Sequence, residues 1–469
     1  MRAAGCRARY NPRWQAGAPP PPDRGPVTHN HPIARQHLRR NWIAFFGDYV
    51  FFGVGLTFAS TSTILPAFAA ALTDNKILIG ATSAIWTGGW LLPQIFAAHW
   101  LSDKPRKWPI MFWGELIGRP IFAVFVVWLL IAGPRYPTLT LIFFFITITY
   151  FVITDAVVAL TWFDIMGKAL APETRGRMIG IGQVVTGLAA LGAGAIIRYA
   201  FSSTGPVFPY NFALILGMAT AAFTLSQISC ALIVEPPEAV AEVRPTLRDY
   251  LPQLAQLLQQ DRAFSRVTAV RLLAGLGTLA STFYVLYATQ VLGLPAASIG
   301  LFAGAATVGT ALAGILLGFV ADRLGTHRVV QIVTWCQFAV PALALLFHQG
   351  IFGPATGLLF PLLYVLMGIF DGSVLLGFLN YVLEISPAGQ RPTYMGLTNT
   401  LSGLLVLVPL AGGWILEHAS YPLLFALAAV GTLAAAVLAL GLPSPKRPVP
   451  AAAPQMAEAE ASLPPRPVT

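Results

Sequence analysis

The stretch GFVADRLGTHR, Gly318–Arg328, interrupts two long apolar runs with an acid, two arginines, a histidine and two glycines. A related charged stretch, LSDKPRK, occupies residues 101–107 in the first half of the chain. A shift of 219 residues places Asp103 on Asp322 and Lys104 on Arg323. A charged turn that recurs at the same place between apolar runs indicates a duplicated membrane module.

The repeat continues beyond these turns. A shift of 216 residues places Asp155 on Asp371 and Gly180 on Gly396. The largest polar gap in the chain, residues 235–266, lies between the two copies. We therefore expect two related halves that follow one another in the same orientation.

The composition excludes a soluble globular protein of this length, because 56% of the residues are hydrophobic and only 10% are charged. A membrane-spanning helix needs about 20 mostly apolar residues. The short alternating strands of a membrane β-barrel are not found. The sequence predicts an all-α polytopic membrane protein of two pseudo-symmetric six-helix bundles, with twelve transmembrane helices at 42–68, 77–101, 109–132, 138–163, 178–197, 211–234, 267–292, 298–321, 329–348, 355–383, 393–416 and 421–441.

The basic residues are distributed unequally between the two sides of these spans. Of 29 Lys and Arg residues, 24 lie in the tails and in the loops after even-numbered spans, whereas only Lys76, Arg135 and Arg198 lie in the other loops. This pattern predicts a multi-pass protein of the plasma (inner) membrane with both termini in the cytoplasm. It also accounts for the net charge of +10 without a nucleic-acid partner.

The chain divides into five predicted segments. Within the linker, leucines recur at helical spacing from Leu247 to Leu258, which indicates an amphipathic helix that lies on the membrane surface or packs beneath the bundle. The segments are a disordered basic cytoplasmic tail at 1–40, an N-terminal six-helix bundle at 41–234, a cytoplasmic linker with this helix at 235–266, a C-terminal six-helix bundle at 267–442 and a disordered cytoplasmic tail at 443–469.

The chain resembles the major facilitator superfamily over residues 41–441. GFVADRLGTHR is similar to the loop signature of that family, and PETRGR, Pro172–Arg177, is similar to the segment that follows its fourth span. The resemblance implies a transporter whose spans 1, 4, 7 and 10 line a central cavity. The first copy of the loop departs from the signature, since His99 and Arg106 stand where glycines belong, so we expect the second copy to contribute more to gating.

The resemblance also implies a gating role for the first charged loop. An Asp in such a turn can cap a helix, and the basic residue after it can pair with an acid on a neighbouring helix. Asp103 and Lys104 inherit this latch role. Asp164, at the end of span 4, is the candidate partner of Lys104 or Arg106.

In the second loop the same role falls on Asp322 and Arg323. Glu384, near the end of span 10, is the candidate partner of Arg323 or Arg328. The alternative for both loops is a set of solvated charges that only follow the positive-inside rule.

Three acids lie within spans that the resemblance assigns to the cavity. A carboxylate inside a bilayer is costly and tends to face a cavity or a partner, where it can exchange a proton. Asp155 and Asp371 are repeat mates in spans 4 and 10, and Asp48 lies in span 1. We expect them to bind substrate or couple protons. The alternatives are a buried structural hydrogen bond for the first two, and an interfacial pair with Arg39 or Arg40 for Asp48.

Two arginines also fall within spans. Glu115 and Arg119 are four residues apart in span 3, so they can neutralise each other as a structural ion pair. Arg271 lies only a few residues inside span 7, and we expect its side chain to extend to the cytoplasm rather than bind a substrate anion. Gly187 and Gly194 in span 5 favour close helix packing.

These features favour a secondary active transporter that moves a small solute by alternating access, coupled to H+. A non-transporting receptor or scaffold is the first alternative, and a membrane-embedded lipid-linked transferase is the second. The chain shows no cluster typical of an enzyme, and its three cysteines predict no disulfide framework, metal site or cofactor. The expected partners are the solute, the coupling proton and the lipid bilayer, with no nucleic acid, and the expected state is a monomer.

Overall fold

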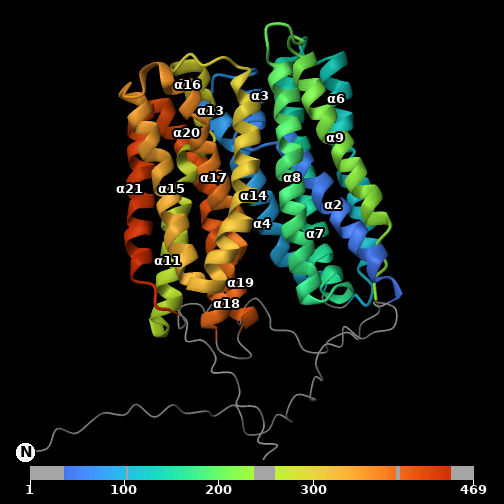
Figure 1. Ribbon diagram of the computed structural model, residues 1–469. Helices are drawn as coiled ribbons and strands as arrows, with labels where there is room; N and C mark the ends of the chain where they lie inside the picture. Colours follow the sequence, from blue (N-terminus) through green and yellow to red (C-terminus); the bar gives the residue numbers. More distant parts are fainter. Residues whose placement is uncertain (1–35, 102–103, 237–258, 387–390, 445–469) are drawn as a thin grey trace, which may run out of the picture.

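Long helices that run back and forth between two faces make up most of the chain in the computed structural model, which describes residues 36–101, 104–236, 259–386 and 391–444 (Figure 1). Ten helical segments are long and apolar enough to cross a membrane. With α2 (Leu38–Phe58) and α4 (Lys76–Leu101), which run beside them, the described chain forms the predicted twelve-helix bundle. The predicted tails, the linker helix and Asp103 lie wholly or largely outside the described residues.

The first half contains six membrane-crossing segments. Proline marks several helix starts, where its missing N–H has no partner to lose. The first segment is α2, and the short α3 (Ile64–Ala70) follows it. The others are α4, α5 with α6 (Trp108–Gly118 and Ile121–Ile131), α7 (Pro137–Ala169), α8 (Pro172–Ala200) and α9 (Tyr210–Ala231).

The second half repeats this arrangement, but three of its segments are broken into shorter helices. Gly275, Gly277, Pro361 and Gly403 lie at the breaks, where the regular hydrogen-bond ladder cannot continue. Its segments are α11–α13 with a π-helical turn (Arg262–Gly275, Thr278–Ser281, Tyr284–Leu286 and Tyr287–Val291), α14 (Ser298–Leu324), α15 (Thr326–His348), α16–α18 with a π-helical stretch (Thr356–Leu359, Pro361–Ser373, Asn380–Ile385 and Val374–Leu379), α19 with α20 (Arg391–Ser402 and Val408–His418) and α21 (Tyr421–Leu440).

The first segment is shorter than the hydropathy of the sequence predicts. We expect a span from 42 to 68, whereas α2 ends at Phe58 and turns occupy the polar run 60–63 before α3 begins. Ser and Thr side chains compete with the helix ladder for backbone hydrogen bonds, which explains the break. Here Ser60 Oγ and Ser62 Oγ lie 3.2 Å apart.

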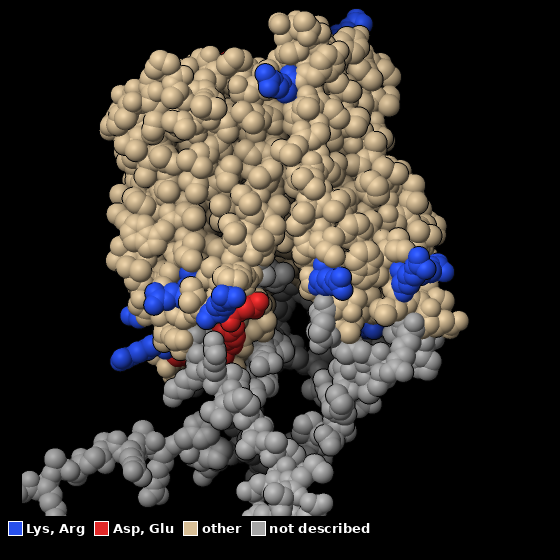
Figure 2. Space-filling model, in the orientation of Figure 1, with Lys and Arg blue, Asp and Glu red and all other residues tan. Residues whose placement is uncertain are grey.

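The described chain begins and ends at the same face of the bundle, which we call the terminal face; the opposite one is the far face (Figure 1). Basic side chains surround the terminal face in Figure 2, as the positive-inside pattern of the sequence predicts.

The N-cap of α11 also lies at this face: Asp261 accepts hydrogen bonds from Ala263 N and Phe264 N, both at 3.0 Å. Its other oxygen accepts from Tyr394 Oη at 2.8 Å and ties α11 to α19.

The two halves meet along two pairs of helices, α8 with α14 and α4 with α20. Small residues allow the backbones to approach. A Cβ atom at Gly194 would lie 2.7 Å from Gly300 O, and one at Gly300 would collide with the backbone of Gly194 and Arg198. A Cβ at Gly413 would likewise collide with Lys76 O. The glycines of the predicted fifth span therefore form part of the interface between the halves.

Substitution of Gly300 by Ala should lower the stability of the protein, because the added methyl group forces the backbones of α8 and α14 apart. The expected cost is about 1–3 kcal/mol, measured as a lower unfolding midpoint of the purified protein in detergent. Gly192→Ala is the matched control, since no atom lies within 4 Å of a Cβ at that glycine. Equal midpoints for the two variants would contradict the close packing of the halves.

Candidate functional site

A cavity of about 270 Å³ lies between the two halves. The bundle is also hollowed between the halves at the terminal face (Figure 2). The first half contributes mainly hydroxyl groups to the cavity, and the second half contributes both charged groups and most of the apolar surface. The lining residues are Thr61, Ser62, Ser83, Thr87, Leu91, Arg271, Gly275, Gly277, Thr278, Ser281, Tyr284, Gln337, Val340, Pro341, Met367, Phe370, Asp371, Val374, Phe378, Ser402, Leu405 and Pro409.

Asp371 is the acid in this cavity. It lies on α17, three residues before the π-helical stretch Val374–Leu379 begins, and its side chain is exposed to the cavity. It makes no ion pair within 4.0 Å to any described residue. Asp371 therefore presents its carboxylate to the cavity.

Arg271 lines the same cavity, which corrects the expectation that it reaches the cytoplasm. α11 begins at Arg262, so Arg271 lies about 13 Å along the helix at 1.5 Å per residue. The span was predicted to start at residue 267, which placed Arg271 closer to the end of the helix than it is in the structure. Its Nη1 atom is buried and has no hydrogen-bond partner among the described residues.

Asp155 does not line this cavity. It lies half-buried on α7, next to the Trp90 side chain, and its charged neighbours are Arg119 and Asp48 of its own half. The repeat that relates Asp155 to Asp371 in sequence thus places the two acids in different surroundings. The structure does not bring them together across a shared cavity.

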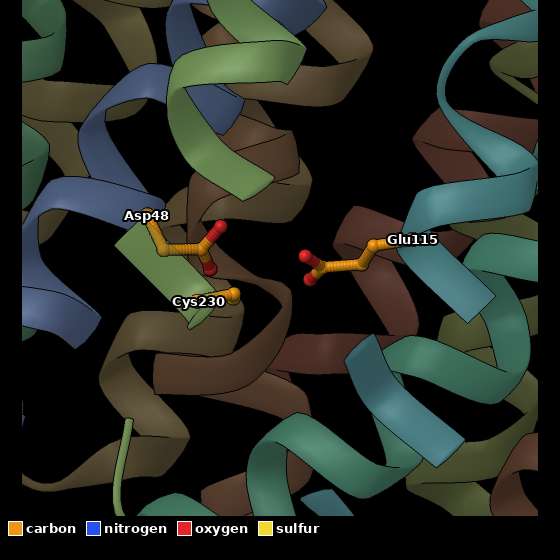
Figure 3. Close-up of side chains that lie close together, drawn as sticks. All are labelled: Asp48, Glu115 and Cys230. Carbon is orange, nitrogen blue, oxygen red and sulfur yellow. The ribbon is translucent and has the colours of Figure 1, made fainter. Parts of the chain in front are cut away.

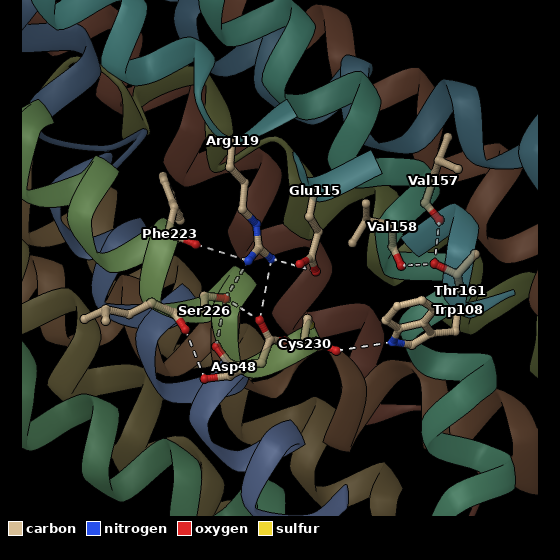
Figure 4. Close-up of polar contacts among 12 residues, drawn as sticks. Asp48, Trp108, Glu115, Arg119, Val157, Val158, Thr161, Phe223, Ser226 and Cys230 are labelled. Carbon is tan, nitrogen blue, oxygen red and sulfur yellow. Dashed lines mark hydrogen bonds and ion pairs between the residues drawn. The ribbon is translucent and has the colours of Figure 1, made fainter. Parts of the chain in front are cut away.

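Asp48, Glu115 and Arg119 form a buried cluster inside the first half (Figure 4). Arg119 Nη2 lies 3.0 Å from Glu115 Oε1 and 3.5 Å from Asp48 Oδ1. Its Nη1 donates to Ser226 Oγ at 2.9 Å and to the backbone oxygen of Phe223 at 3.2 Å. The expected contact between Glu115 and Arg119 is present, but α2 and α9 complete the cluster.

The position of Asp48 bears on the alternative of an interfacial ion pair. It is only 5% exposed and accepts a hydrogen bond from Ser226. Arg40, the alternative partner, donates instead to the backbone oxygen of Leu232 at 2.8 Å. Asp48 is therefore not an interfacial acid paired with a basic residue of the tail.

The same cluster has the composition of a small metal site, because ligand atoms of Asp48, Glu115 and Cys230 lie within 4.8 Å of one another (Figure 3). The guanidinium of Arg119 already contacts both carboxylates, and a metal cation would be repelled by it. Two carboxylates and one guanidinium leave one negative charge, and Glu115 Oε2 has no partner among the described residues. The group fits a shared proton better than a metal ion.

The first charged loop is held within its own half. Asp164 lies 2.8 Å from Lys107 Nζ and 2.7 Å from Lys168 Nζ, whereas we expected Lys104 or Arg106. Glu235 extends this network and accepts from Lys107 N at 2.7 Å. The loop between α4 and α5, residues 102–107, offers three basic residues to this acid, and their spacing in the sequence does not tell which of them pairs with it.

Lys104 and Arg106 have different surroundings from the ones expected. The ammonium group of Lys104 lies 5.8 Å from the centre of the Trp100 ring, as in a cation–π contact. Arg106 is exposed on the loop. Neither is placed against Asp164 by any described contact.

The second charged turn also differs from the expectation. Asp322 is exposed in the last turn of α14, and Gly325, with φ +89°, precedes α15 without a side-chain cap. Arg323 lies over the Phe319 ring at 4.1 Å. The positive φ requires a glycine at this turn, which explains that part of the motif.

Glu384 accepts a hydrogen bond from Thr326 Oγ1 at 2.6 Å rather than pairing with Arg323 or Arg328. Arg328 donates to Gln331 Oε1 at 2.9 Å. All these contacts lie within the second half. The described contacts of the latch residues thus each lie within one half in this state.

The sequence reasoning missed several polar residues of these sites. Ser226, Trp90 and Gln337 were not singled out, because each is an isolated polar or aromatic residue in an apolar span. Gln337 could have been found, since an amide inside a membrane helix needs a partner or a cavity. The other two have no comparable signal.

Replacement of Arg119 by Gln should destabilise the protein by about 3–5 kcal/mol, because it leaves two buried carboxylates without their cation. The double variant Glu115→Gln/Arg119→Gln should recover part of this loss. The unfolding midpoint in detergent measures both effects. Arg135→Gln, at an exposed arginine, is the control, and an equal midpoint for Arg119→Gln and Arg135→Gln would contradict the cluster.

Comparisons with known proteins agree with this architecture. Residues 267–468 match the family model described as Major Facilitator Superfamily. No curated protein sequence matches the chain. The resemblance to this superfamily is thus confirmed by sequence for the second half.

Three solved transporters share the fold at low sequence identity. The nucleoside transporter NupG has a TM-score of 0.58 and 13% identity, with 86% of this chain and 98% of that chain covered. The D-xylose-proton symporter has a TM-score of 0.59 and 14% identity, with 88% and 99% covered. A bacterial homologue of the iron transporter ferroportin, in its inward-facing state, has a TM-score of 0.62 and 15% identity, with 86% and 98% covered.

Proposed function

We propose that this chain, which shares its fold with transporters of the major facilitator superfamily, is a secondary active transporter that moves a small solute by alternating access. One observation carries the proposal: a single cavity between the two halves is lined by an acid and an arginine, Asp371 and Arg271. Ionisable groups at this depth are costly unless they serve a solute or an ion. A receptor or scaffold has no need for them, and the proposed activity is transport rather than catalysis.

The structure has the contacts expected of a state closed at the far face. Thr57 Oγ1 lies 3.1 Å from Thr307 Oγ1, and Lys76 N donates to Glu417 Oε2 at 2.9 Å, both between the halves. Among the described residues, no hydrogen bond joins the halves at the terminal face. The fold also matches the ferroportin homologue better in its inward-facing state than in its outward-facing state, with TM-scores of 0.62 and 0.57.

The charge asymmetry supports a cytoplasmic terminal face in the plasma membrane. In that orientation the hollow between the halves at the terminal face is on the cytoplasmic side (Figure 2). The tails, 1–40 and 443–469, and the linker 235–266 then lie on the cytoplasmic side of bundles 41–234 and 267–442. We propose a monomer, since one chain supplies both halves around the cavity.

The charged loops would act in the opposite state. When the terminal face closes, the loops after α4 and α14 approach each other. The contacts that Lys107 and Thr326 now make inside their halves would then exchange for contacts between the halves. The latch residues in this proposal are Asp103, Lys104, Arg106, Asp164, Asp322, Arg323, Arg328 and Glu384.

We assign proton coupling first to Asp371, because it is the acid that lines the cavity. Asp155 and Asp48 are second candidates, since both belong to the charge network around Arg119. A solved neighbour named as a D-xylose-proton symporter supports this type of coupling. Binding of a proton can drive the cycle only through a different affinity in the two states.

Reconstituted wild-type protein should concentrate its solute about tenfold for each coupled proton under a gradient of one pH unit, which stores about 1.4 kcal/mol. Asp371→Asn should retain exchange of labelled for unlabelled solute but lose this accumulation, because the amide cannot carry a proton. Solutes for the assay are those that raise the unfolding midpoint of the purified protein.

Asp74→Asn, at an exposed acid beside the far face, is the control and should accumulate solute as the wild type does. Accumulation by Asp371→Asn at the wild-type level would contradict coupling at this residue. Failure of the wild type to exchange any solute that binds it would contradict transport itself.

A further inference from the structure

Arg271 places a buried hydrogen-bond donor in the cavity wall that the protein does not use. Its Nη1 is buried without a partner among the described residues, although a guanidinium has five N–H donors and stays charged at any physiological pH. The arginine of the first half shows the contrast, because Arg119 donates to Glu115, Ser226 and Phe223. An unpaired buried cation is strongly unfavourable unless another group compensates it.

The nearest candidate for compensation inside the protein does not supply it. Asp371 lines the same cavity, yet the two side chains form no ion pair within 4.0 Å in the described part of the chain. Apart from these two, no Asp, Glu, Lys or Arg is found among the described residues of the cavity wall. The positive charge of Arg271 therefore faces the space that a solute occupies.

The rest of the wall suits a small polar solute. Thr61, Ser62 and Thr87 from the first half bring hydroxyl groups to the cavity. Gln337 lies on the wall of the second half, and its Oε1 atom also lacks a partner among the described residues. Hydroxyl and amide groups can bind a polar solute from both sides, while Arg271 alone offers a full positive charge.

We propose that the cavity binds a small organic solute through a carboxylate group that Arg271 holds. The proposal rests on the transport function above and names its substrate class. A guanidinium binds a carboxylate through two parallel hydrogen bonds, which neither a neutral solute nor a cation can accept. The solute carboxylate then shares the cavity with Asp371, and the two negative charges repel each other unless Asp371 holds a proton. Carboxylate and proton thus occupy the cavity together.

A first experiment tests the charge of the cavity without knowledge of the substrate. The full chain carries Thr278→Cys, two helical turns from Arg271 on the cavity wall, and Cys6 and Cys336 are replaced by Ser. Cys230 stays because it is fully buried. The labelling rates of the anionic sulfonatoethyl and the cationic trimethylammonioethyl methanethiosulfonate are compared, with the same chain lacking Thr278→Cys as background.

The ratio of anionic to cationic labelling should fall at least about tenfold on Arg271→Gln, because a charged cleft concentrates ions of opposite sign. Arg271→Lys and Arg135→Gln should keep the ratio, and Asp371→Asn should raise it. A ratio that Arg271→Gln leaves unchanged would overturn the proposal whether or not the protein transports. A changed ratio in a protein without exchange activity would leave the anion site in place and refute transport alone.

A second experiment tests recognition of the carboxylate. Thermal unfolding of the purified full chain is followed with carboxylates and their neutral amides, such as benzoate with benzamide and lactate with lactamide, and with inorganic phosphate. The proposal expects a carboxylate to stabilise the wild type and its amide to fail. It also expects both Arg271→Gln and Arg271→Lys to bind that carboxylate at least about tenfold more weakly, because lysine cannot form two parallel bonds. Equal stabilisation by acid and amide, or by phosphate and not by any carboxylate, would overturn it.

Discussion

A charged group inside a bilayer needs a partner, and the two halves of this protein meet that requirement in different ways. The first half pairs its charges internally: Arg119 lies between Asp48 and Glu115, and none of the three lines the cavity. The second half leaves Arg271 and Asp371 facing the cavity between the halves. Under the proposed transport function, the solute site follows from this difference, because a solute in the cavity can reach Arg271 and Asp371.

The duplicated sequence therefore does not produce a duplicated site. Asp155 and Asp371 occupy equivalent positions, but Asp155 belongs to the surroundings of Arg119 and Asp371 belongs to the cavity wall. The halves meet through backbone contacts at Gly194, Gly300 and Gly413 and through hydrogen bonds such as that from Lys76 N to Glu417 Oε2. The first half neutralises its own buried charges, whereas the second half presents its charges to the cavity.

The fold could be predicted from the sequence because hydropathy and the distribution of basic residues act over whole spans. Residues 421–441 were expected to cross the membrane, and α21 covers Tyr421–Leu440. The site was harder to predict. Arg271 was expected near the membrane surface because hydropathy places the start of a span directly after a charged residue. In the structure, α11 begins at Arg262, five residues before the predicted span. Asp164 pairs with Lys107 because of the conformation of the loop. The hydrophobic periodicity of the sequence carries no information on loop conformation.

The breaks in the second half have a mechanical consequence. Of its six segments, those that contain α11, α17 and α20 are each interrupted by glycine, proline or a π-helical stretch, and all three contribute residues to the cavity wall. A helix bends more easily where a backbone hydrogen bond is missing than where its hydrogen bonds are continuous. In the proposed transport cycle, these broken helices can therefore bend around a bound solute before either half rotates as a whole.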